Sequence, residues 1–154
     1  FDSIDFSHKN NISTIVNAED QNKTDLEKTL DWCIDHNYTS LSIFGISGQS
    51  EDHFLGNFFI INEYSDTIAC IIYTDYSTIT PCIGETIFDS FEGETVSIVS
   101  FEQENRITST NLQYPLDGYK LSASVRAIRN TSLGETFTIE SSDKVMIFQV
   151  KDKL

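Results

Sequence analysis

The chain has 154 residues, which is enough to bury a core as one domain or as two small ones. Hydrophobic residues make up 39% and aromatic residues 12% of the chain, and this composition argues against a disordered segment. The formal net charge of −14 argues against nucleic acid and anionic membranes as partners, because both are bound through Lys and Arg. The negative charge does not exclude the binding of one phosphorylated small molecule through a metal ion.

The cysteines and the apolar runs bear on the cellular compartment. Cys33, Cys70 and Cys82 are odd in number and widely spaced, without a Cys-x-x-Cys pair. We therefore expect no disulfide framework and a reducing, cytoplasmic setting. No apolar run of the sequence reaches the length that crosses a bilayer, so we expect no membrane partner.

The first half of the chain is predicted to alternate strands and helices. Ile12–Val16 is short, β-branched and apolar, which predicts a buried strand. A helix is predicted from about Thr24 to His36, and Thr24-Asp-Leu-Glu27 has the pattern of a capping box at its start. The apolar residues at helical spacing on one face are Leu26, Leu30, Cys33 and Ile34.

A second strand and helix follow at similar spacing. Leu41–Phe44 predicts a strand, and a helix is predicted from about Glu51 to Tyr64. Ile68–Tyr73 predicts a third buried strand. This alternation indicates a parallel sheet. The residues expected to be buried on the second helix are Phe54, Leu55, Phe58, Phe59 and Ile61.

The pattern changes after Thr74 to short alternating runs that are typical of an antiparallel β-sandwich or small barrel. The fold class expected is therefore α/β plus all-β, with an α/β domain at 1–78 and an antiparallel β-sandwich domain at 79–154. Turns, including Ser141-Ser-Asp143, separate the runs. The predicted strands are Glu94–Phe101, Arg106–Gln113, Tyr119–Arg126, Glu135–Glu140 and Lys144–Val150.

Acidic residues are concentrated where the predicted strands of the first half lead into helices. Asp20 and Asp25 bracket the first helix start, and Asp52 follows Gly45-x-x-Gly48 at the second. Open α/β sheets bind ligands at the carboxyl ends of their strands, and free amides at a helix start favour phosphate. The carboxylates would repel phosphate unless a cation lay between them, and Mg²⁺ prefers oxygen ligands. The alternative is structural, because Asp near a helix start also complements the helix dipole.

Several other catalytic classes are excluded by missing motifs. The sequence has no Gly-x-x-x-x-Gly-Lys-Ser/Thr loop and no Gly-x-Ser-x-Gly elbow, and its histidines lack zinc-ligand spacing. In the second half, Tyr114-Pro115 could form an aromatic wall, and Arg126, Arg129 and Asn130 supply several hydrogen-bond donors. The alternative for these residues is ordinary turn chemistry.

Taken together, these residues resemble the thiamin pyrophosphokinase family in four blocks that occur in the family's order. Phe1-Asp-Ser-Ile4 is similar to the end of its Gly-Asp-Phe-Asp-Ser-Ile motif, and Asp20-Gln-Asn-Lys-Thr-Asp25 with Lys28 to its Asp-Gln-x-x-Thr-Asp block. Gly45–Asn57 is similar to its Gly-x-x-Gly-x-Arg-x-Asp-His-x-Leu-x-Asn block. Leu112–Leu116 and Asn130–Gly134 are similar to its thiamin-domain pattern.

The resemblance implies an α/β catalytic domain and a β-sandwich thiamin-binding domain. It also implies Mg²⁺-dependent transfer of a pyrophosphoryl group from ATP to the hydroxyl of thiamin, giving thiamin diphosphate and AMP. The family forms homodimers whose active sites lie between the α/β domain of one subunit and the β domain of the other. The residues implied are Asp25 and Asp52 for catalysis; Asp2, Asp20 and Asp25 for the metal; Thr24, Lys28, Gly45, Gly48 and Asn57 for the nucleotide; and Gln21 and Asn130 for thiamin.

The chain also departs from the family pattern. Ser50 stands where the family usually has Arg, and Arg129 and Thr131 flank Asn130 where small and acidic residues are usual. The family carries a further portion before its first block, so we expect a natural chain that is longer at its N-terminus. Two other readings remain open at this stage. One is a non-catalytic thiamin- or nucleotide-binding module, and the other is an adhesion or carbohydrate module that explains the β half only.

Overall fold

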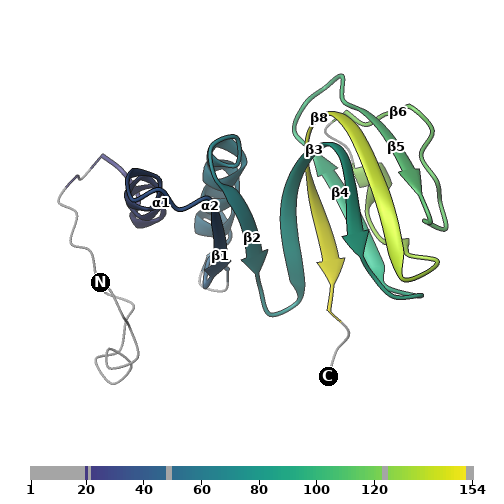
Figure 1. Cartoon of the computed structure of the whole chain (residues 1–154), viewed down its shortest axis with the longest axis horizontal. Coiled ribbons are helices and arrows are strands. Elements are labelled where there is room, and N and C mark those ends of the chain that lie inside the picture. The colour runs from purple at the N-terminus through teal and green to yellow at the C-terminus, as the bar shows by residue number, and fades with distance from the viewer. Residues whose placement is uncertain (1–19, 21, 48–49, 123–124, 152–154) are drawn as a thin grey trace. The chain divides into compact units, whose positions relative to one another are not determined.

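The computed structural model describes residues 20, 22–47, 50–122 and 125–151 (Figure 1). The chain divides into two compact units, residues 1–37 and 38–154. The predicted strand Ile12–Val16 lies outside the described residues. None of the helices within these ranges is long and apolar enough to span a membrane.

Helix α1, Asp25–Asp35, confirms the first predicted helix and its capping box. The Thr24 hydroxyl accepts from the Glu27 N–H at 3.2 Å, and the Thr24 N–H donates to the Glu27 carboxylate at 2.7 Å. Both bonds satisfy amides that have no partner inside the helix. Leu30 and Cys33 are buried, as their helical spacing predicts.

Strands β1 (Ser40–Phe44) and β2 (Ala69–Tyr73) are parallel and are joined through helix α2 (Glu51–Tyr64), as predicted. Their buried side chains alternate with exposed ones, and Ile43 and Ile72 belong to the buried set. On the other face Phe44 is 69% and Ile71 is 40% exposed. The prediction of a fully buried third strand is therefore wrong, because the side chains on one face of β2 include the exposed Ile71.

Helix α2 buries a narrower stripe than the sequence suggests. Phe58 and Ile61 are buried, whereas Leu55 and Phe59 are each 51% exposed, so the prediction of their burial is wrong. Adjacent residues differ by about 100° around a helix, which turns Leu55 and Phe59 away from the Phe58–Ile61 stripe. The Phe58 ring lies 5.6 Å from the Phe148 ring and so packs α2 on the strands of the second half.

The second half is an antiparallel assembly organised by two long strands, β3 (Ser77–Asp89) and β8 (Thr136–Val150), which pair along most of their length (Figure 1). The sheet order is β1-β2-β3-β8-β4-β7, with β5 paired to β8 and β6 to β5. A β-bulge between Cys82 and Gly84 bends the pair. The other strands are β4 (Thr95–Ser100), β5 (Arg106–Thr110), β6 (Tyr119–Lys120) and β7 (Asn130–Thr131).

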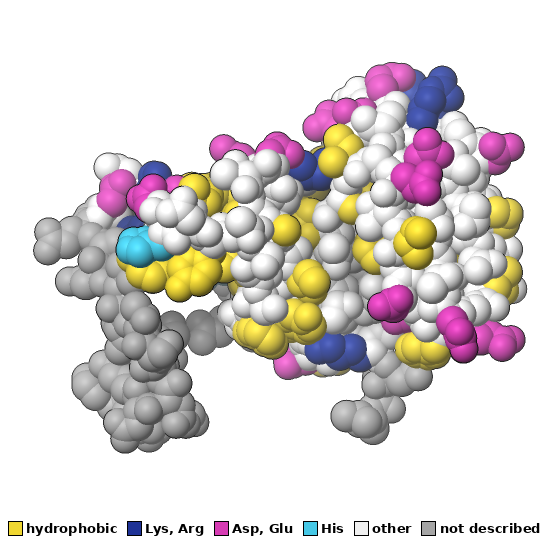
Figure 2. All heavy atoms as spheres, in the orientation of Figure 1, with side chains coloured by type: hydrophobic (Ala, Val, Ile, Leu, Met, Phe, Trp, Pro, Cys, Tyr) yellow, Lys and Arg dark blue, Asp and Glu magenta, His cyan; other side chains and the backbone are white. Residues whose placement is uncertain are grey.

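The sandwich core is apolar, and acidic side chains are spread over its surface. Figure 2 shows Asp and Glu on much of this face, whereas Lys and Arg occur in only a few places. The clustered core residues are Phe88, Val96, Ile98, Ile107, Leu112, Leu121, Ala127, Phe137, Ile139, Val145 and Ile147. The parallel pairing of β1 with β2 and the antiparallel pairing of β3, β4 and β5 with β8 confirm the two fold classes expected, a parallel α/β part and an antiparallel β part.

Two details of the second half differ from the prediction. The predicted turn Ser141-Ser-Asp143 is wrong, because β8 runs through it without a break. The buried Asn105 side chain accepts from the Asp143 N–H at 3.1 Å and donates to the Asp143 carbonyl at 2.9 Å, which holds this polar segment extended. The strand predicted at Tyr119–Arg126 is also too long, since only β6 and a short 3-10 helix, η2 (Val125–Ala127), form there.

A lysine of β8 joins the two halves of the second unit. The Lys144 ammonium donates to the Asn62 carbonyl in the last turn of α2 and pairs with Asp66 at 2.8 Å. Helix α2 has no basic residue in its own last turn, so Lys144 supplies the cation that complements the helix dipole. The predicted domain boundary near residue 78 falls at the start of β3.

Candidate functional site

The start of α1 presents two exposed carboxylates. Asp20 accepts from the Asn22 N–H at 2.8 Å, and Asp25 accepts from the Lys28 ammonium at 3.4 Å. The Asp25 side chain is 88% exposed, so most of its hydrogen-bonding capacity is open to solvent. Thr24, Asp25 and Lys28 therefore lie on one helix start, as the sequence predicts, whereas Gln21 lies outside the described residues.

The carboxylates expected to hold the metal or to act in catalysis fall in different parts of the chain. Asp2 is outside the described residues, Asp20 and Asp25 belong to the first unit, and Asp52 belongs to the second. Within the described ranges, no three His, Cys, Asp or Glu side chains are grouped to hold a metal ion. The exposed oxygens of Asp20 and Asp25 still fit Mg²⁺ in their chemistry, because that ion prefers carboxylate and water oxygens.

The connection from β1 to α2 is shaped by Gly45 and Asn57. Gly45 has φ +76°, a left-handed conformation that glycine adopts without a steric cost. The Asn57 side chain donates to the Ile46 carbonyl at 3.4 Å and so fastens the connection to the helix. Gly48 lies outside the described residues. The observed role of Asn57 is thus to hold the backbone beside the candidate site.

Asp52 lies in the first turn of α2 and is exposed to solvent. A hydrogen bond from the Ser50 hydroxyl is the main cause that lowers the pKa of Asp52 below its ordinary value. The His53 N–H also donates to its carboxylate, at 2.9 Å. Ser50, which stands where the family usually has Arg, therefore acts on the adjacent catalytic candidate.

We expect Ser50→Ala to raise the pKa of Asp52 toward its ordinary value, because the hydroxyl that stabilises the charged form is lost. The Ser50 side chain makes no capping bond to α2, so the helix should keep its stability. Carboxyl-carbon NMR titration of Asp52 measures the shift. Ser47→Ala, in the same connection, serves as the control with no change expected. If the pKa of Asp52 is unchanged in Ser50→Ala, the hydrogen bond assigned to the Ser50 hydroxyl is contradicted.

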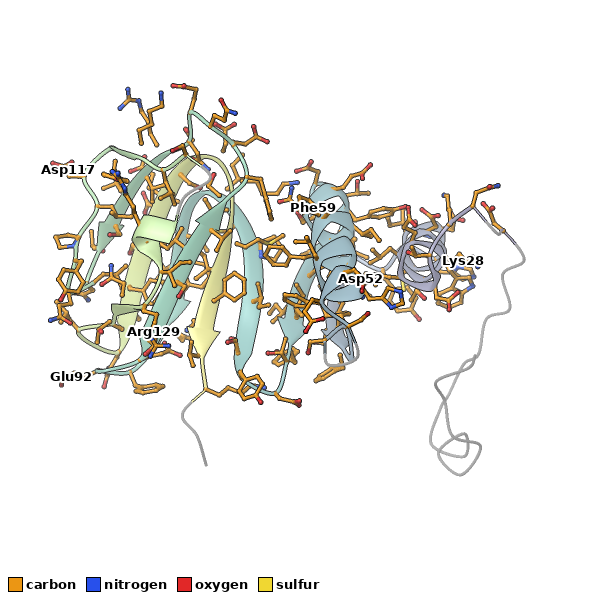
Figure 3. The ribbon with its side chains drawn as sticks, turned by 180° about the vertical axis from the view of Figure 1, so that it is seen from behind. Lys28, Asp52, Phe59, Glu92, Asp117 and Arg129 are labelled. Carbon is orange, nitrogen blue, oxygen red and sulfur yellow. The ribbon has the colours of Figure 1, made fainter. Side chains whose placement is uncertain are left out.

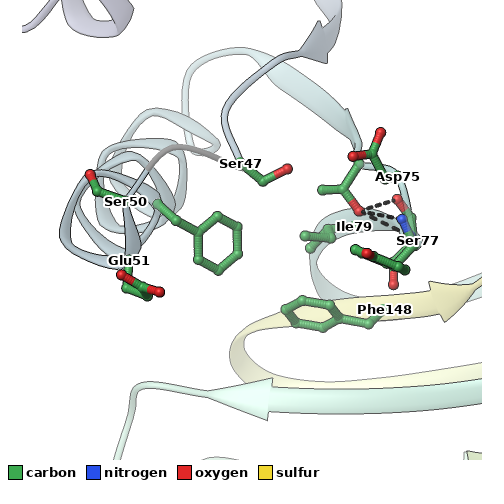
Figure 4. Close-up of a pocket in the computed structure, with 10 residues that line it drawn as sticks. Ser47, Ser50, Glu51, Asp75, Ser77, Ile79 and Phe148 are labelled. Atoms are coloured by element: carbon green, nitrogen blue, oxygen red, sulfur yellow. Dashed lines mark hydrogen bonds between the residues drawn. The ribbon is translucent and has the colours of Figure 1, made fainter.

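A pocket of about 380 Å³ opens where β1 and β2 end (Figure 4). Figure 4 shows Ser50 and Glu51 at the start of α2 on one side, Asp75 and Ser77 on the opposite side, and Phe148 of β8 between them. This is the edge at which α/β sheets bind ligands. The lining residues are Ser47, Ser50, Glu51, Phe54, Thr74, Asp75, Tyr76, Ser77, Ile79 and Phe148.

The far wall of this pocket is a hydrogen-bonded turn that sequence reasoning missed. The Thr74 hydroxyl accepts from the Ser77 N–H at 2.9 Å and donates to the Ser77 carbonyl at 3.1 Å. Lys151 closes the turn from outside, because its ammonium donates to the Thr74 carbonyl at 2.6 Å and its N–H to the Tyr76 carbonyl at 2.8 Å. The feature of the sequence that could have indicated this turn is the predicted strand Ile68–Tyr73, because the turn follows its carboxyl end.

Asn130 occupies a second candidate region, in the β part. Its side chain is buried, with 4% of the residue exposed, and it clamps the backbone of Tyr114. The amide oxygen accepts from the Tyr114 N–H at 3.0 Å, and the amide nitrogen donates to the Tyr114 carbonyl at 2.7 Å. The Tyr114 ring is 65% exposed. Asn130 therefore fixes the backbone from which this exposed aromatic side chain projects.

Arg129, beside this clamp, has a left-handed backbone with φ 60°, which is unfavourable for a residue other than glycine. Its N–H donates to the Ser97 hydroxyl at 2.9 Å, which stabilises the conformation. Figure 3 shows Arg129 toward the end of the sandwich that also carries Glu92. Among the described residues, no hydrogen-bond or ion-pair partner of the exposed guanidinium is present.

We expect Arg129→Gly to raise the free energy of unfolding by up to about 1 kcal/mol, because glycine adopts φ 60° without a Cβ clash. Urea denaturation measures the change. Arg126→Gly is the comparison, since Arg126 is not in a left-handed conformation and donates to the Tyr119 hydroxyl at 3.2 Å. That variant should be less stable than the parent. A clear loss of stability in Arg129→Gly would contradict the assigned strain.

Comparison with protein-family models gives two matches that follow one another along the chain. The model of the thiamin pyrophosphokinase catalytic domain matches residues 1–72. The model of the thiamin pyrophosphokinase substrate-binding domain matches residues 78–148. Asp52 lies in the first match and Asn130 in the second, and the pocket is lined by residues of both matches and of the segment between them.

Individual relatives agree with these matches. A thiamine pyrophosphokinase of Bacillus subtilis is 29% identical over 126 residues, which cover 76% of this chain and 59% of that protein. The crystal structure of thiamine pyrophosphokinase from Bacillus subtilis has the same fold, with a TM-score of 0.85 over 99% of this chain and 77% of that one at 24% identity. The crystal structure of thiamin pyrophosphokinase from Geobacillus thermodenitrificans has a TM-score of 0.75 at 25% identity. This match covers 88% of this chain and 65% of that one. The chain belongs to the thiamin pyrophosphokinase family.

Proposed function

We propose that the protein of which this chain is part is a thiamin pyrophosphokinase. It would transfer a pyrophosphoryl group from ATP to the hydroxyl of thiamin, giving thiamin diphosphate and AMP. The observation that carries this proposal is the pair of consecutive family matches, catalytic at 1–72 and substrate-binding at 78–148, on a fold with a pocket at the ends of β1 and β2. A protein of this family that only bound its ligands would need no exposed carboxylates at two helix starts.

The first match would supply the residues that bind the phosphates. Thr24 and Lys28 on α1, and Gly45, Gly48 and Asn57 around the start of α2, are the proposed nucleotide contacts. Asp2, Asp20 and Asp25 would hold Mg²⁺, which would neutralise charge on the phosphates when bound. The bond between Lys28 and Asp25 is long, at 3.4 Å, which leaves both groups able to turn toward a ligand.

Catalysis would rest mainly on the positioning of the reactants. The thiamin hydroxyl attacks the β-phosphorus in line with the leaving AMP, and its proton passes to a carboxylate. Asp25 and Asp52 are the proposed catalytic residues, and the hydrogen bond from the Ser50 hydroxyl, which lowers the pKa of Asp52, favours its charged form. Gln21 and Asn130 are the proposed thiamin residues. Asn130 would act chiefly through the Tyr114 segment that it holds.

The assembly is part of the proposal. We propose a homodimer in the cytoplasm, in which the domain at 1–78 of one subunit meets the domain at 79–154 of the other. The exposed Tyr114 ring and the exposed Asp52 carboxylate would then face substrates from different chains. Mixing Asp52→Asn and Asn130→Ala subunits would restore part of the activity only in such an arrangement.

The test is AMP release by the full-length protein from ATP and Mg²⁺, with and without thiamin. Thiamin-dependent AMP together with stoichiometric thiamin diphosphate is the expected result. Omission of Mg²⁺ should abolish both products. Inorganic phosphate or ADP as the main product would indicate a different transfer reaction. If calorimetry shows that thiamin binds but no AMP is released, the protein is a thiamin-binding module and not an enzyme.

A further inference from the structure

Arg129 differs from the other cationic side chains that the structure describes, because its guanidinium has no partner among the described residues. Figure 3 shows Glu92 toward the same end of the sandwich, yet no ion pair or hydrogen bond joins these two described residues. The chain has 24 Asp and Glu against 10 Lys and Arg, so a carboxylate partner would be the ordinary outcome. An unpaired guanidinium keeps its N–H donors available for an anion from outside the chain. The other described cations each donate to a carboxylate, a carbonyl or a hydroxyl, and they are Lys23, Lys28, Arg106, Lys120, Arg126, Lys144 and Lys151.

The backbone of Arg129 is also held in a conformation that residues with a Cβ rarely adopt. Its φ is 60°, and two anchors keep it there. The Arg129 N–H donates to the Ser97 hydroxyl at 2.9 Å, and the next residue, Asn130, is buried. Strained positions persist where the surrounding structure imposes them, and they are frequent at ligand-binding sites. Because the Arg129 side chain is exposed, its strained position indicates a role in binding rather than in packing.

The segment that carries Tyr114 runs beside Arg129. The Gln113 N–H donates to the Thr131 carbonyl at 2.8 Å, and the Asn130 side chain binds both backbone groups of Tyr114. The two segments run antiparallel, so one further step along the second brings Arg129 to the Tyr114 end of the first. An exposed aromatic ring and an unpaired cation therefore lie on neighbouring segments of the substrate-binding match at 78–148.

We propose that Arg129 binds the diphosphate group of thiamin diphosphate, the product of the proposed reaction. Thiamin itself carries a positive charge on its thiazolium ring and no anionic group, so a guanidinium beside its site opposes its binding. Once the pyrophosphoryl group is joined to the hydroxyl, the same guanidinium can hold two of the new oxygens at once. Arg129 thus distinguishes the phosphorylated product from the substrate. This inference rests on the proposed function, because it assigns a contact to that reaction's product.

The test measures binding of thiamin, thiamin diphosphate and ATP, each alone, to the full-length protein by calorimetry without Mg²⁺. Arg129→Gly should weaken the binding of thiamin diphosphate by about tenfold, since charge-assisted hydrogen bonds are lost. The binding of thiamin should be unchanged or tighter, because the removed charge repelled it. Arg129→Lys keeps the charge without the planar fork, so its affinity for thiamin diphosphate should fall between those of Arg129→Gly and the parent.

Arg129→Gly also separates binding from folding. The variant should be at least as stable toward urea as the parent, because the backbone strain is relieved, so a less stable protein cannot explain its weaker binding. Arg126→Gln is the matched control, since Arg126 is exposed three residues earlier and donates to the Tyr119 hydroxyl. It should bind thiamin diphosphate like the parent.

Three results would overturn the proposal. The first is an equal affinity of Arg129→Gly and the parent for thiamin diphosphate. The second is an equal weakening of thiamin and thiamin diphosphate, which would show that Arg129 only shapes the site. The third is a weaker binding of ATP with thiamin diphosphate unchanged, which would assign the guanidinium to the donor.

Product inhibition separates this inference from the proposed function. In a full-length enzyme that makes thiamin diphosphate, the inhibition constant of that product should rise about tenfold in Arg129→Gly. An unchanged constant would refute the contact and leave the kinase intact. A protein that binds thiamin diphosphate through Arg129 but releases no AMP would refute the kinase and leave the contact.

Discussion

Replacing Asp25 by Asn is expected to lower the kcat of thiamin diphosphate formation by about a hundredfold or more in the full-length protein. The amide has the shape of the carboxylate, but it cannot accept a proton and does not offset the charge of a cation. The Asp25 side chain is 88% exposed, and its partner among the described residues is Lys28, whose ammonium lies 3.4 Å away, so the fold should not depend on it. The measurement is AMP release at saturating ATP and thiamin.

Asp35→Asn is the matched control, since Asp35 ends the same helix and is also exposed. Its activity should stay within a factor of two or so of the parent, since surface substitutions usually have small effects. The Mg²⁺ concentration at half-maximal rate adds a second readout. It should rise in Asp25→Asn if the carboxylate holds the ion. Full activity in Asp25→Asn would remove this residue from the proposed catalytic and metal sets.

The second large effect concerns stability. Asn105→Ala should reduce the free energy of unfolding by about 3 kcal/mol, because it leaves several buried polar groups without partners. Asn105 is fully buried. Its amide nitrogen donates to the Ser100 hydroxyl at 3.1 Å and to the carbonyls of Asp143 and Lys144 at 2.9 and 3.2 Å. Its amide oxygen accepts from the Asp143 N–H at 3.1 Å.

Urea denaturation with an unchanged m-value measures this loss. Ser142→Ala is the control, because Ser142 is exposed and its loss leaves the bonds of the Asn105 amide to Ser100, Asp143 and Lys144 in place. The Ser142 hydroxyl accepts from the Arg106 N–H at 2.9 Å and donates to the side chains of Asn105 and Asp143 at 3.3 Å each. This control substitution should cost less than about 1 kcal/mol. Equal stabilities of the two variants would show that β8 stays extended without the Asn105 network.

The helices were predictable because their signals are local. The capping box of α1 lies within four consecutive residues, Thr24 to Glu27, and α2 follows directly from the spacing of Phe54, Phe58 and Ile61. The continuity of β8 was not predictable, because Ser141 is held by partners that are distant in sequence. It pairs with Gly84 of β3 and with Ile107 of β5. A polar Ser-Ser-Asp segment predicts a turn unless these strands are known.

The candidate site likewise has residues that the sequence could indicate and residues that it could not. Motifs indicated Asp25, Asp52 and Asn130, since each lies in a short block of residues. They could not indicate the pocket, whose walls come from Phe54, Tyr76 and Phe148, three segments that meet only through folding. They also could not show that Asn130 clamps Tyr114, sixteen residues earlier in the chain.

The shared strands of the second unit constrain how its α/β part and its sandwich could move relative to each other. β3 pairs with β2 at its start and continues into the sandwich, and Lys144 of β8 is anchored to the last turn of α2. A hinge between the α/β part and the sandwich would have to break these bonds, whereas domain hinges normally use a few unpaired loop residues. The pocket at the ends of β1 and β2 and the Tyr114 segment are therefore expected to move together rather than about a hinge between them.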